Sequence, residues 1–164
     1  MRPTGESPFP SARMIDVGSK EVTLRRAVAS GRVRVGRIVR IAIEAGTIPK
    51  GNVFEVARVA GIMAAKRTAT LLPLCHPLPL EAIDLHIEAG EDTVFIRAEV
   101  RTHARTGVEM EALVAVSAAC LTVYDMCKSL PEGQSAVIEE IVLDEKSGGA
   151  GGPYNRSLSS KRSP

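Results

Sequence analysis

The sequence has 164 residues, 45% of them hydrophobic and 24% charged, which is typical of one soluble globular domain. The net charge of +2 is nearly balanced and gives no reason to expect nucleic acid as a partner. The three cysteines provide no disulfide framework, and no segment reaches the roughly 20 consecutive apolar residues of a membrane span, so we expect no membrane association.

The two ends of the chain differ in composition from its middle, because residues 1–13 and 150–164 are rich in Pro, Ser and Gly. Such segments bury too little apolar surface to offset the entropy lost on ordering. We therefore expect a disordered N-terminal segment at 1–13, a folded domain at 14–149 and a disordered tail at 150–164. The first segment also lacks the apolar run of a secretory signal, so we expect a cytoplasmic protein.

The first half of the domain is expected to contain a strand and two helices. The strand lies within 23–35, where β-branched residues alternate weakly, and a short helix follows at 37–45. A second helix is expected over 52–68, with Asn52 as its N-cap. Prolines then bracket a rigid, non-helical connection at 73–77.

The second half of the domain contains the clearest patterns. Residues 82–89 and 93–101 alternate between apolar and polar, and the polar link 90–92 makes them a hairpin. A long helix at 108–130 is apolar on almost every side, and a last strand follows at 136–144. This order predicts an α+β fold, a ferredoxin-like antiparallel sheet with helices packed on one face. A helix apolar all round needs more cover than one sheet gives, so we expect a homo-oligomer.

Three cations lie where a functional role competes with an ordinary one. Lys50 stands in a Pro-Lys-Gly turn, either as a solvated turn residue or as an amine held for a site. Lys66 and Arg67 close the second predicted helix, where they could interact with the helix dipole or bind phosphate. The sequence pattern alone leaves these alternatives open.

Cys75 and His76 lie between prolines in an apolar segment. A histidine with restricted freedom suits a group that donates or accepts a proton at fixed geometry. Metal binding is the competing role, but no second Cys or His pair has chelating spacing, so we expect no metal site.

Ionisable residues mark both ends of the long predicted helix. Glu109 and Glu111 lie in its first turn, where carboxylates stabilise the helix dipole, but about 200° separates them, so one can serve a site instead. Asp125 and Lys128 share a face near its end, as a surface ion pair or as an acid/base pair. Lys146 adds a cation at a glycine-rich turn after the last predicted strand.

The spacing along this helix constrains any site that uses both ends. Glu111 and Asp125 are separated by about 21 Å along the axis, at about 1.5 Å per residue. A nucleotide-sized ligand can reach both only if two subunits build the site.

Seven short motifs occur in order along the chain. They are KG at 50–51, ARVAGI at 57–62, AAKRT at 64–68, LPLCHPL at 72–78, TGVEMEAL at 106–113, LTVYDMCK at 121–128 and EKSGG at 145–149. This series resembles the cyclic pyranopterin monophosphate synthase family, over about residues 14–149. The resemblance implies a lyase of molybdenum cofactor biosynthesis that converts 3′,8-cyclo-7,8-dihydro-GTP into cyclic pyranopterin monophosphate and pyrophosphate, without a cofactor.

The resemblance also implies a hexamer built as a trimer of dimers, with the site at a dimer interface. The implied catalytic residues are Asp125, Lys128 and Lys50, and the implied substrate contacts are Leu74, Cys75, His76, Met110 and Glu111. To these we add Glu109 as a further substrate contact, and Lys66, Arg67 and Lys146 as cations that neutralise the triphosphate. The chain departs from the family pattern at Asn52 and at residues 150–151.

Two other functions compete with this one. A non-catalytic nucleotide- or anion-sensing module would explain the cations but not the Asp125/Lys128 pair. An RNA-binding ferredoxin-like domain would stack bases on sheet aromatics, and Phe95 alone is aromatic in the predicted hairpin strands.

Overall fold

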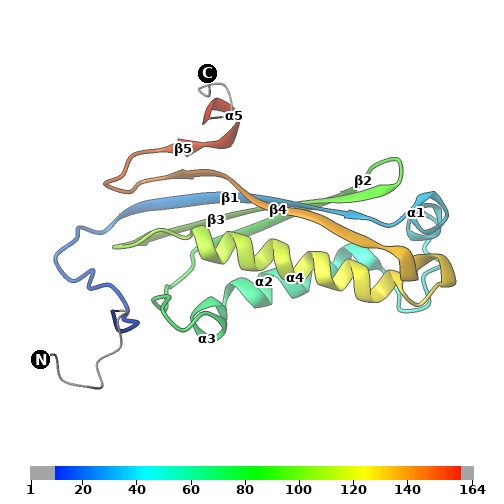
Figure 1. The fold of residues 1–164 in the computed structure, drawn as a ribbon, viewed down its shortest axis with the longest axis horizontal. Coiled ribbons are helices and arrows are strands. Elements are labelled where there is room, and N and C mark those ends of the chain that lie inside the picture. Colours follow the sequence, from blue (N-terminus) through cyan, green and yellow to red (C-terminus); the bar gives the residue numbers. More distant parts are fainter. Residues whose placement is uncertain (1–9, 160–164) are drawn as a thin grey trace, which may run out of the picture.

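The computed structural model of the protein describes residues 10–159 and contains one antiparallel sheet with the strand order β2-β3-β1-β4-β5 (Figure 1). The strands are β1 (Thr23–Arg34), β2 (Ala82–Ala89), β3 (Thr93–Ala104), β4 (Val137–Ser147) and β5 (Tyr154–Asn155). The helices are α1 (Arg37–Glu44), α2 (Val53–Ala65), α3 (Thr68–Leu71), α4 (Glu109–Cys127) and α5 (Arg156–Ser159), with a 3-10 helix at Pro131–Ser135.

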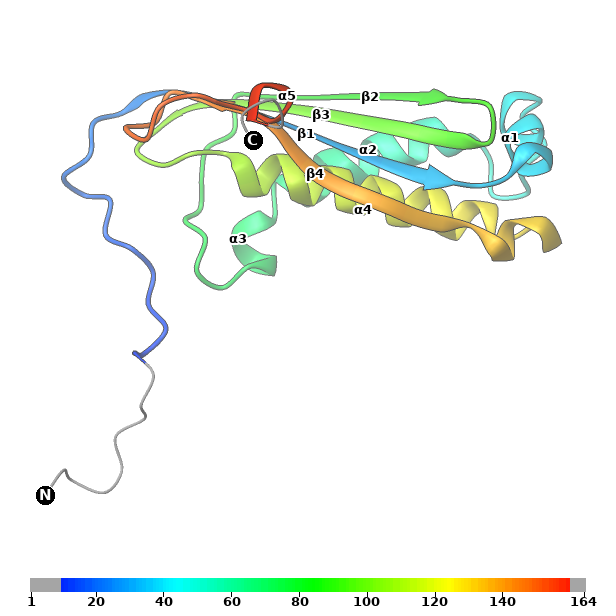
Figure 2. The same cartoon turned by 45° about the horizontal axis from the view of Figure 1, so that its top comes forward.

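Helices α2 and α4 cover one face of the sheet and lie against each other (Figures 1 and 2). Small residues let these layers approach closely: Ala27 and Ala29 of β1, like Ala115 and Ala119 of α4, are completely buried. The core therefore consists mainly of aliphatic and alanine side chains, as the low aromatic content requires. The predicted α+β class, the antiparallel sheet and the helices on one face are confirmed.

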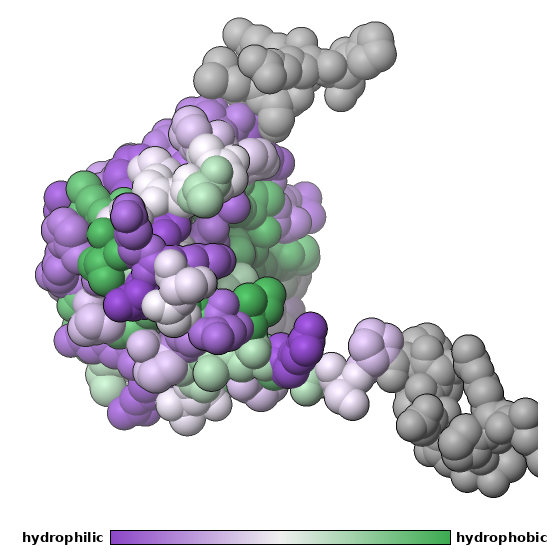
Figure 3. All heavy atoms as spheres, turned by 90° about the vertical axis from the view of Figure 1, so that its left-hand side faces the viewer, coloured by the Kyte–Doolittle hydropathy of each residue, from purple (hydrophilic) through white to green (hydrophobic). Residues whose placement is uncertain are grey.

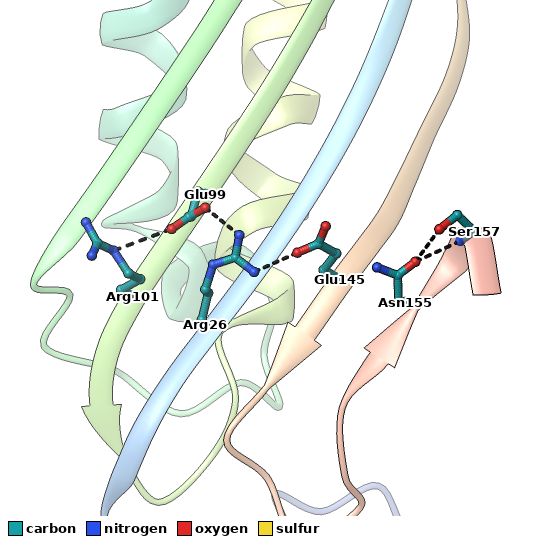
Figure 4. Close-up of polar contacts among 6 residues, drawn as sticks. All are labelled: Arg26, Glu99, Arg101, Glu145, Asn155 and Ser157. Atoms are coloured by element: carbon teal, nitrogen blue, oxygen red, sulfur yellow. Dashed lines mark hydrogen bonds and ion pairs between the residues drawn. The ribbon is translucent and has the colours of Figure 1, made fainter. Parts of the chain in front are cut away.

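The opposite face of the sheet is charged. Arg26 on β1 binds Glu99 of β3 and Glu145 of β4, each at 2.7 Å (Figure 4). Arg101 of β3 extends this row through contacts of 3.6 Å with Glu99 and with Asp84 of β2. Half-exposed ion pairs of this kind contribute about 0–1 kcal/mol each, and they keep this face polar.

Most local predictions agree with the structure. Strand β2 and the hairpin after it occur as expected, and the Asn52 side chain caps α2 by accepting a hydrogen bond from the Glu55 N–H at 3.1 Å. The last strand is longer than predicted, because β4 pairs with β1 as far as Ser147. Lys146 therefore lies within a strand and not in the turn that follows it.

Helix α4 is more apolar than expected, since the sequence was expected to contain no segment with the apolar length of a membrane span. Its 19 residues are long and apolar enough, by length and composition, to cross a membrane. Half of this window is buried inside the protein, where α4 packs on α2 and on three strands. Its apolar character is therefore explained by its position as the central core helix.

The C-terminal region contains more structure than its composition predicts. Strand β5 pairs with residues 145–146 of β4, and helix α5 follows it. The chain can turn back here because Gly148 and Gly152 have φ values of 90° and 77°, which glycine adopts without strain. Residues 1–9 and 160–164, which belong to the two segments predicted to be disordered, lie outside the described residues.

Candidate functional site

Three of the predicted site residues meet at the C-terminal end of α4. The Lys50 ammonium group donates to the Asp125 carboxylate at 2.6 Å and to the Asp125 carbonyl oxygen at 2.9 Å. Lys128 binds the other carboxylate oxygen of Asp125 at 2.9 Å, so the predicted ion pair is present. Helix α4 supplies Asp125 and its C-cap Lys128, whereas the turn before α2 supplies Lys50. We call these residues the lysine–aspartate cluster.

The charges in this cluster favour the ionised forms of Asp125 and Lys128. Lys50 and then Lys128, mainly through hydrogen bonds, lower the pKa of the Asp125 carboxyl to about 2. Asp125 in turn raises the pKa of the Lys128 ammonium group. All three side chains are 41–54% exposed, so a ligand can reach them. At neutral pH the cluster therefore holds one carboxylate between ammonium groups.

A cavity of about 440 Å³ lies at the other end of α4. Its walls include six of the predicted substrate-binding residues: Leu74, Cys75, His76, Glu109, Met110 and Glu111. The first three come from the connection bracketed by prolines, and the last three come from the first turn of α4. The end of the molecule that carries the N-terminus of α4 is mainly hydrophilic, with hydrophobic residues scattered between (Figure 3). The cavity volume is within the range of small-molecule sites.

Glu111 is the most deeply buried ionisable group of the cavity, with 4% exposure. Burial raises the pKa of its carboxyl above the ordinary 4.5, and the nearby charge of Glu109 raises it further. Burial first, and then the Glu111 charge, also raise the pKa of the Cys75 thiol. The cavity thus holds a shielded carboxyl group beside a thiol that stays protonated at neutral pH.

The remaining predicted cations lie outside the cavity lining. Lys146 binds the Glu109 carboxylate at 3.1 Å and so neutralises one of the two acidic residues of the cavity. Lys66 and Arg67 follow α2 and are exposed, and no ion pair of their side chains occurs within residues 10–159. Both remain available for an anion.

Sequence reasoning did not predict seven residues that line the cavity. Leu78, Thr106 and Gly107 lie within the motifs but were not named as contacts, and the other four are Arg13, Ile15, Val17 and Lys20. These last four belong to the irregular segment before β1, part of which was expected to be disordered. No local pattern marks this segment as part of a site, because its position depends on contacts with residues far along the chain.

One chain does not bring the two groups of site residues together. Glu111 and Asp125 lie in the same uninterrupted helix, so about 21 Å of helix separates the cavity from the lysine–aspartate cluster. Helix α2 runs antiparallel to α4, with Lys50 near Asp125 and Gly61 near Ala115. Lys66 and Arg67, after the end of α2, therefore lie toward the cavity end.

The described part of the chain has no group of three or more His, Cys, Asp or Glu side chains arranged to hold a metal ion. The three cysteines are free, and burial raises the pKa of Cys120 to about 12 and that of Cys127 to about 11. Both thiols are inert core groups on α4.

Comparison with known proteins shows the family to which the chain belongs. The model of the MoaC family matches residues 14–149. The chain is 55% identical over 147 residues to cyclic pyranopterin monophosphate synthase 3 of Mycobacterium tuberculosis, which covers 89% of this chain and 82% of that protein. It is 53% identical to cyclic pyranopterin monophosphate synthase of Heliobacterium modesticaldum (88% and 91%) and 50% identical to that of Streptomyces avermitilis (90% and 85%). With a family match over most of its length and relatives at this identity, the chain belongs to the MoaC family.

Proposed function

We propose that this protein is a cyclic pyranopterin monophosphate synthase, a lyase of molybdenum cofactor biosynthesis. It converts 3′,8-cyclo-7,8-dihydro-GTP into cyclic pyranopterin monophosphate and releases pyrophosphate. The observation that carries the proposal is the lysine–aspartate cluster of Lys50, Asp125 and Lys128, present in a chain of this family. A sensing module needs no such cluster, whereas a reaction with several proton transfers does.

The protonation states suggest distinct roles for the three residues. With a pKa of about 2, Asp125 is a weak base at neutral pH, so its main role is to hold two ammonium groups in place. Lys128, which Asp125 keeps in the protonated form that can donate, is assigned as the proton donor, and Lys50 stabilises negative charge. In cyclic phosphate formation a hydroxyl oxygen of the substrate bonds to the α-phosphorus and loses its proton to solvent, while the bond between the α-phosphorus and the leaving pyrophosphate breaks. An ammonium group nearby stabilises the charge that develops on the pyrophosphate.

The cavity at the start of α4 suits the purine-derived part of the substrate. A buried carboxyl such as that of Glu111 can accept hydrogen bonds from adjacent N–H groups of a guanine-type edge. Leu74 and Met110 supply apolar walls, and His76 can orient the sugar or the base. Lys66, Arg67 and Lys146 then contribute positive charge toward the triphosphate.

A complete site requires a second copy of the chain. The separation of about 21 Å between cavity and cluster supports a site in which one subunit gives the cavity and its partner gives the lysine–aspartate cluster. The outer side of the helical layer also carries exposed apolar residues, including Val59 on α2 and Leu121 on α4, which is 60% exposed. A two-fold pair that covers this surface would build two equivalent sites. Three such dimers would give a hexamer, with ferredoxin-like subunits, in the cytoplasm.

The first experiment compares wild-type protein with the Lys128→Ala variant on 3′,8-cyclo-7,8-dihydro-GTP. Wild type should form pyrophosphate and cyclic pyranopterin monophosphate in equal amounts, and the variant should lose about a hundredfold or more in kcat, as expected for a missing general acid.

The matched control is Arg101→Gln, which removes a cation from the charged outer face and should retain wild-type turnover. A folded wild-type protein that binds the substrate without turnover would instead support the ligand-sensing function. Substantial activity of Lys128→Ala would exclude Lys128 as the proton donor.

A further inference from the structure

Residues 13–20, called the strap below, run along the cavity at the N-terminal end of α4. Four of them contribute to its lining: Arg13, Ile15, Val17 and Lys20. Only Val17 is half-buried, the other seven residues are exposed, and Ile15 is 71% exposed. Apolar packing therefore contributes little to holding the strap, and other contacts must fix its position.

The main contacts of the strap come from one side chain. Arg105 Nη1 donates to the carbonyl oxygens of Gly18, at 2.7 Å, and of Lys20, at 2.5 Å. The strap itself forms a tight turn here, because the Lys20 N–H donates to the Val17 carbonyl at 3.0 Å. Two bonds from a guanidinium group to carbonyls two residues apart fix both the position and the orientation of this turn.

Arg105 is held in place by a second arginine. Arg25 of β1 is 8% exposed, and its Nε and Nη2 atoms donate to the carbonyl oxygens of Ala104, at 3.2 Å, and of Arg105, at 3.1 Å. The main chain that carries Arg105 is thus anchored to the centre of the sheet. Thr106 and Gly107, directly after it, line the cavity, whereas Arg105 does not.

The charges on the two sides of the cavity differ. Glu109 and Glu111 lie on the helix side, and Arg13 and Lys20 lie on the strap. A ligand with hydrogen-bond donors on its base and negative charge on its phosphates complements this arrangement. Without the Arg105 contacts, the two cations would be carried by an unrestrained segment and would lose this fixed position.

We propose that Arg105 is a positioning residue that holds the strap over the cavity, so that Arg13 and Lys20 bind the phosphate portion of the substrate. The identity of the substrate rests on the proposed function. Arg105 makes no contact with the substrate and acts through the backbone of residues 18–20. Its loss affects mainly substrate binding, because its side chain donates to the backbone of the strap and takes no part in the lysine–aspartate cluster.

The test compares Arg105→Gln and Arg105→Lys with wild type in steady-state kinetics. Arg105→Gln should raise KM about tenfold or more, as expected for two lost charge-assisted hydrogen bonds, while kcat changes less than about threefold. Arg105→Lys retains a cationic donor and should recover part of the affinity. Arg101→Gln, which removes an arginine four residues earlier on the outer face, is the control and should keep the wild-type KM.

Trypsin digestion provides a readout that does not depend on turnover. Trypsin cleaves after Lys20, and the Arg105 contact to the Lys20 carbonyl restrains this bond. Mass spectrometry should find cleavage after Lys20 about tenfold faster in Arg105→Gln than in wild type or Arg101→Gln, in proportion to the strap population that is released.

The kinetic and digestion experiments test the role of the strap separately from the proposed function. If wild type turns over but Arg105→Gln keeps its KM, the positioning role is wrong and the enzyme assignment stands. If wild type does not turn over, the enzyme assignment fails, and an unchanged cleavage rate in Arg105→Gln would then also overturn the strap. Faster cleavage would retain it as a ligand-binding segment.

Discussion

The carboxyl of Glu111 has opposite effects on function and on stability. Its pKa is raised by burial above the ordinary 4.5, so the folded state disfavours its charged form. This penalty is absent below about pH 4.5, where the carboxyl is protonated in both the folded and the unfolded chain, and grows as the pH rises through the folded-state pKa.

Glu111→Gln should therefore raise the thermal unfolding midpoint at pH 7.5 and have little effect at pH 4, because glutamine has no charge to bury. The same variant should lose activity, since the amide cannot replace a carboxylate as a double acceptor. Thermal denaturation followed by circular dichroism at both pH values measures the effect. Glu132→Gln, at an exposed position of the 3-10 helix, is the control. A lower midpoint for Glu111→Gln at pH 7.5 would show that the buried carboxyl is stabilising.

At the scale of elements, the contact between α2 and α4 depends on one missing side chain. A Cβ added at Gly61 would lie 2.4 Å from a methyl carbon of Leu85 and 2.9 Å from the Ala115 carbonyl oxygen. The first contact can shift with a side chain, but the second involves the backbone of α4. Gly61 therefore sets how closely the two helices that carry the site residues approach.

Gly61→Ala should destabilise the protein by about 1–3 kcal/mol, the usual range for overpacking, although alanine is the better helix former. Urea denaturation gives the change in the free energy of unfolding. Ala60→Gly, at the neighbouring position, measures the helix-propensity effect alone and should cost about 1 kcal/mol. A Gly61→Ala protein more stable than wild type would mean that the helices separate at little cost.

The sequence predicted well those elements that are specified by local patterns. Alternation in β2, the Asn52 cap of α2 and the three-residue spacing of Asp125 and Lys128 all depend on near neighbours. The strap and β5 depend on distant partners instead: Gly18 and Arg105 are 87 positions apart, and β5 exists only because β4 presents an edge. Motif resemblance named five of the thirteen cavity residues as contacts, but spacing could not show that Lys50 would reach Asp125, 75 positions away.

At the scale of the whole molecule, a site shared between subunits predicts how mixtures of two inactive variants behave. Lys128→Ala damages only the cluster half of a shared site, and Glu111→Gln damages only the cavity half. Co-expressed in equal amounts, two variants that are inactive alone should form hybrid dimers with one intact site, and random pairing should restore about a quarter of wild-type activity. The pyrophosphate assay measures the recovery.

A mixture of Lys128→Ala with Lys50→Ala is the control, because both changes lie in the same half and every hybrid site stays damaged. Recovery in the control as large as in the first mixture would indicate subunit exchange effects unrelated to a shared site. No recovery in the first mixture, with hybrids present by mass spectrometry, would argue that each chain holds a complete site.

Because α4 carries site residues at both of its ends, its number of residues sets both the distance and the rotation between these two sets. Every residue of an α-helix adds about 1.5 Å and about 100° of rotation. A single insertion or deletion within Glu109–Cys127 would swing one set of site residues through more than a quarter turn relative to the other, even if the core still packed. Point substitutions in the middle of this helix can therefore be tolerated where changes in its number of residues cannot, and divergence within this segment should proceed by replacement at constant length.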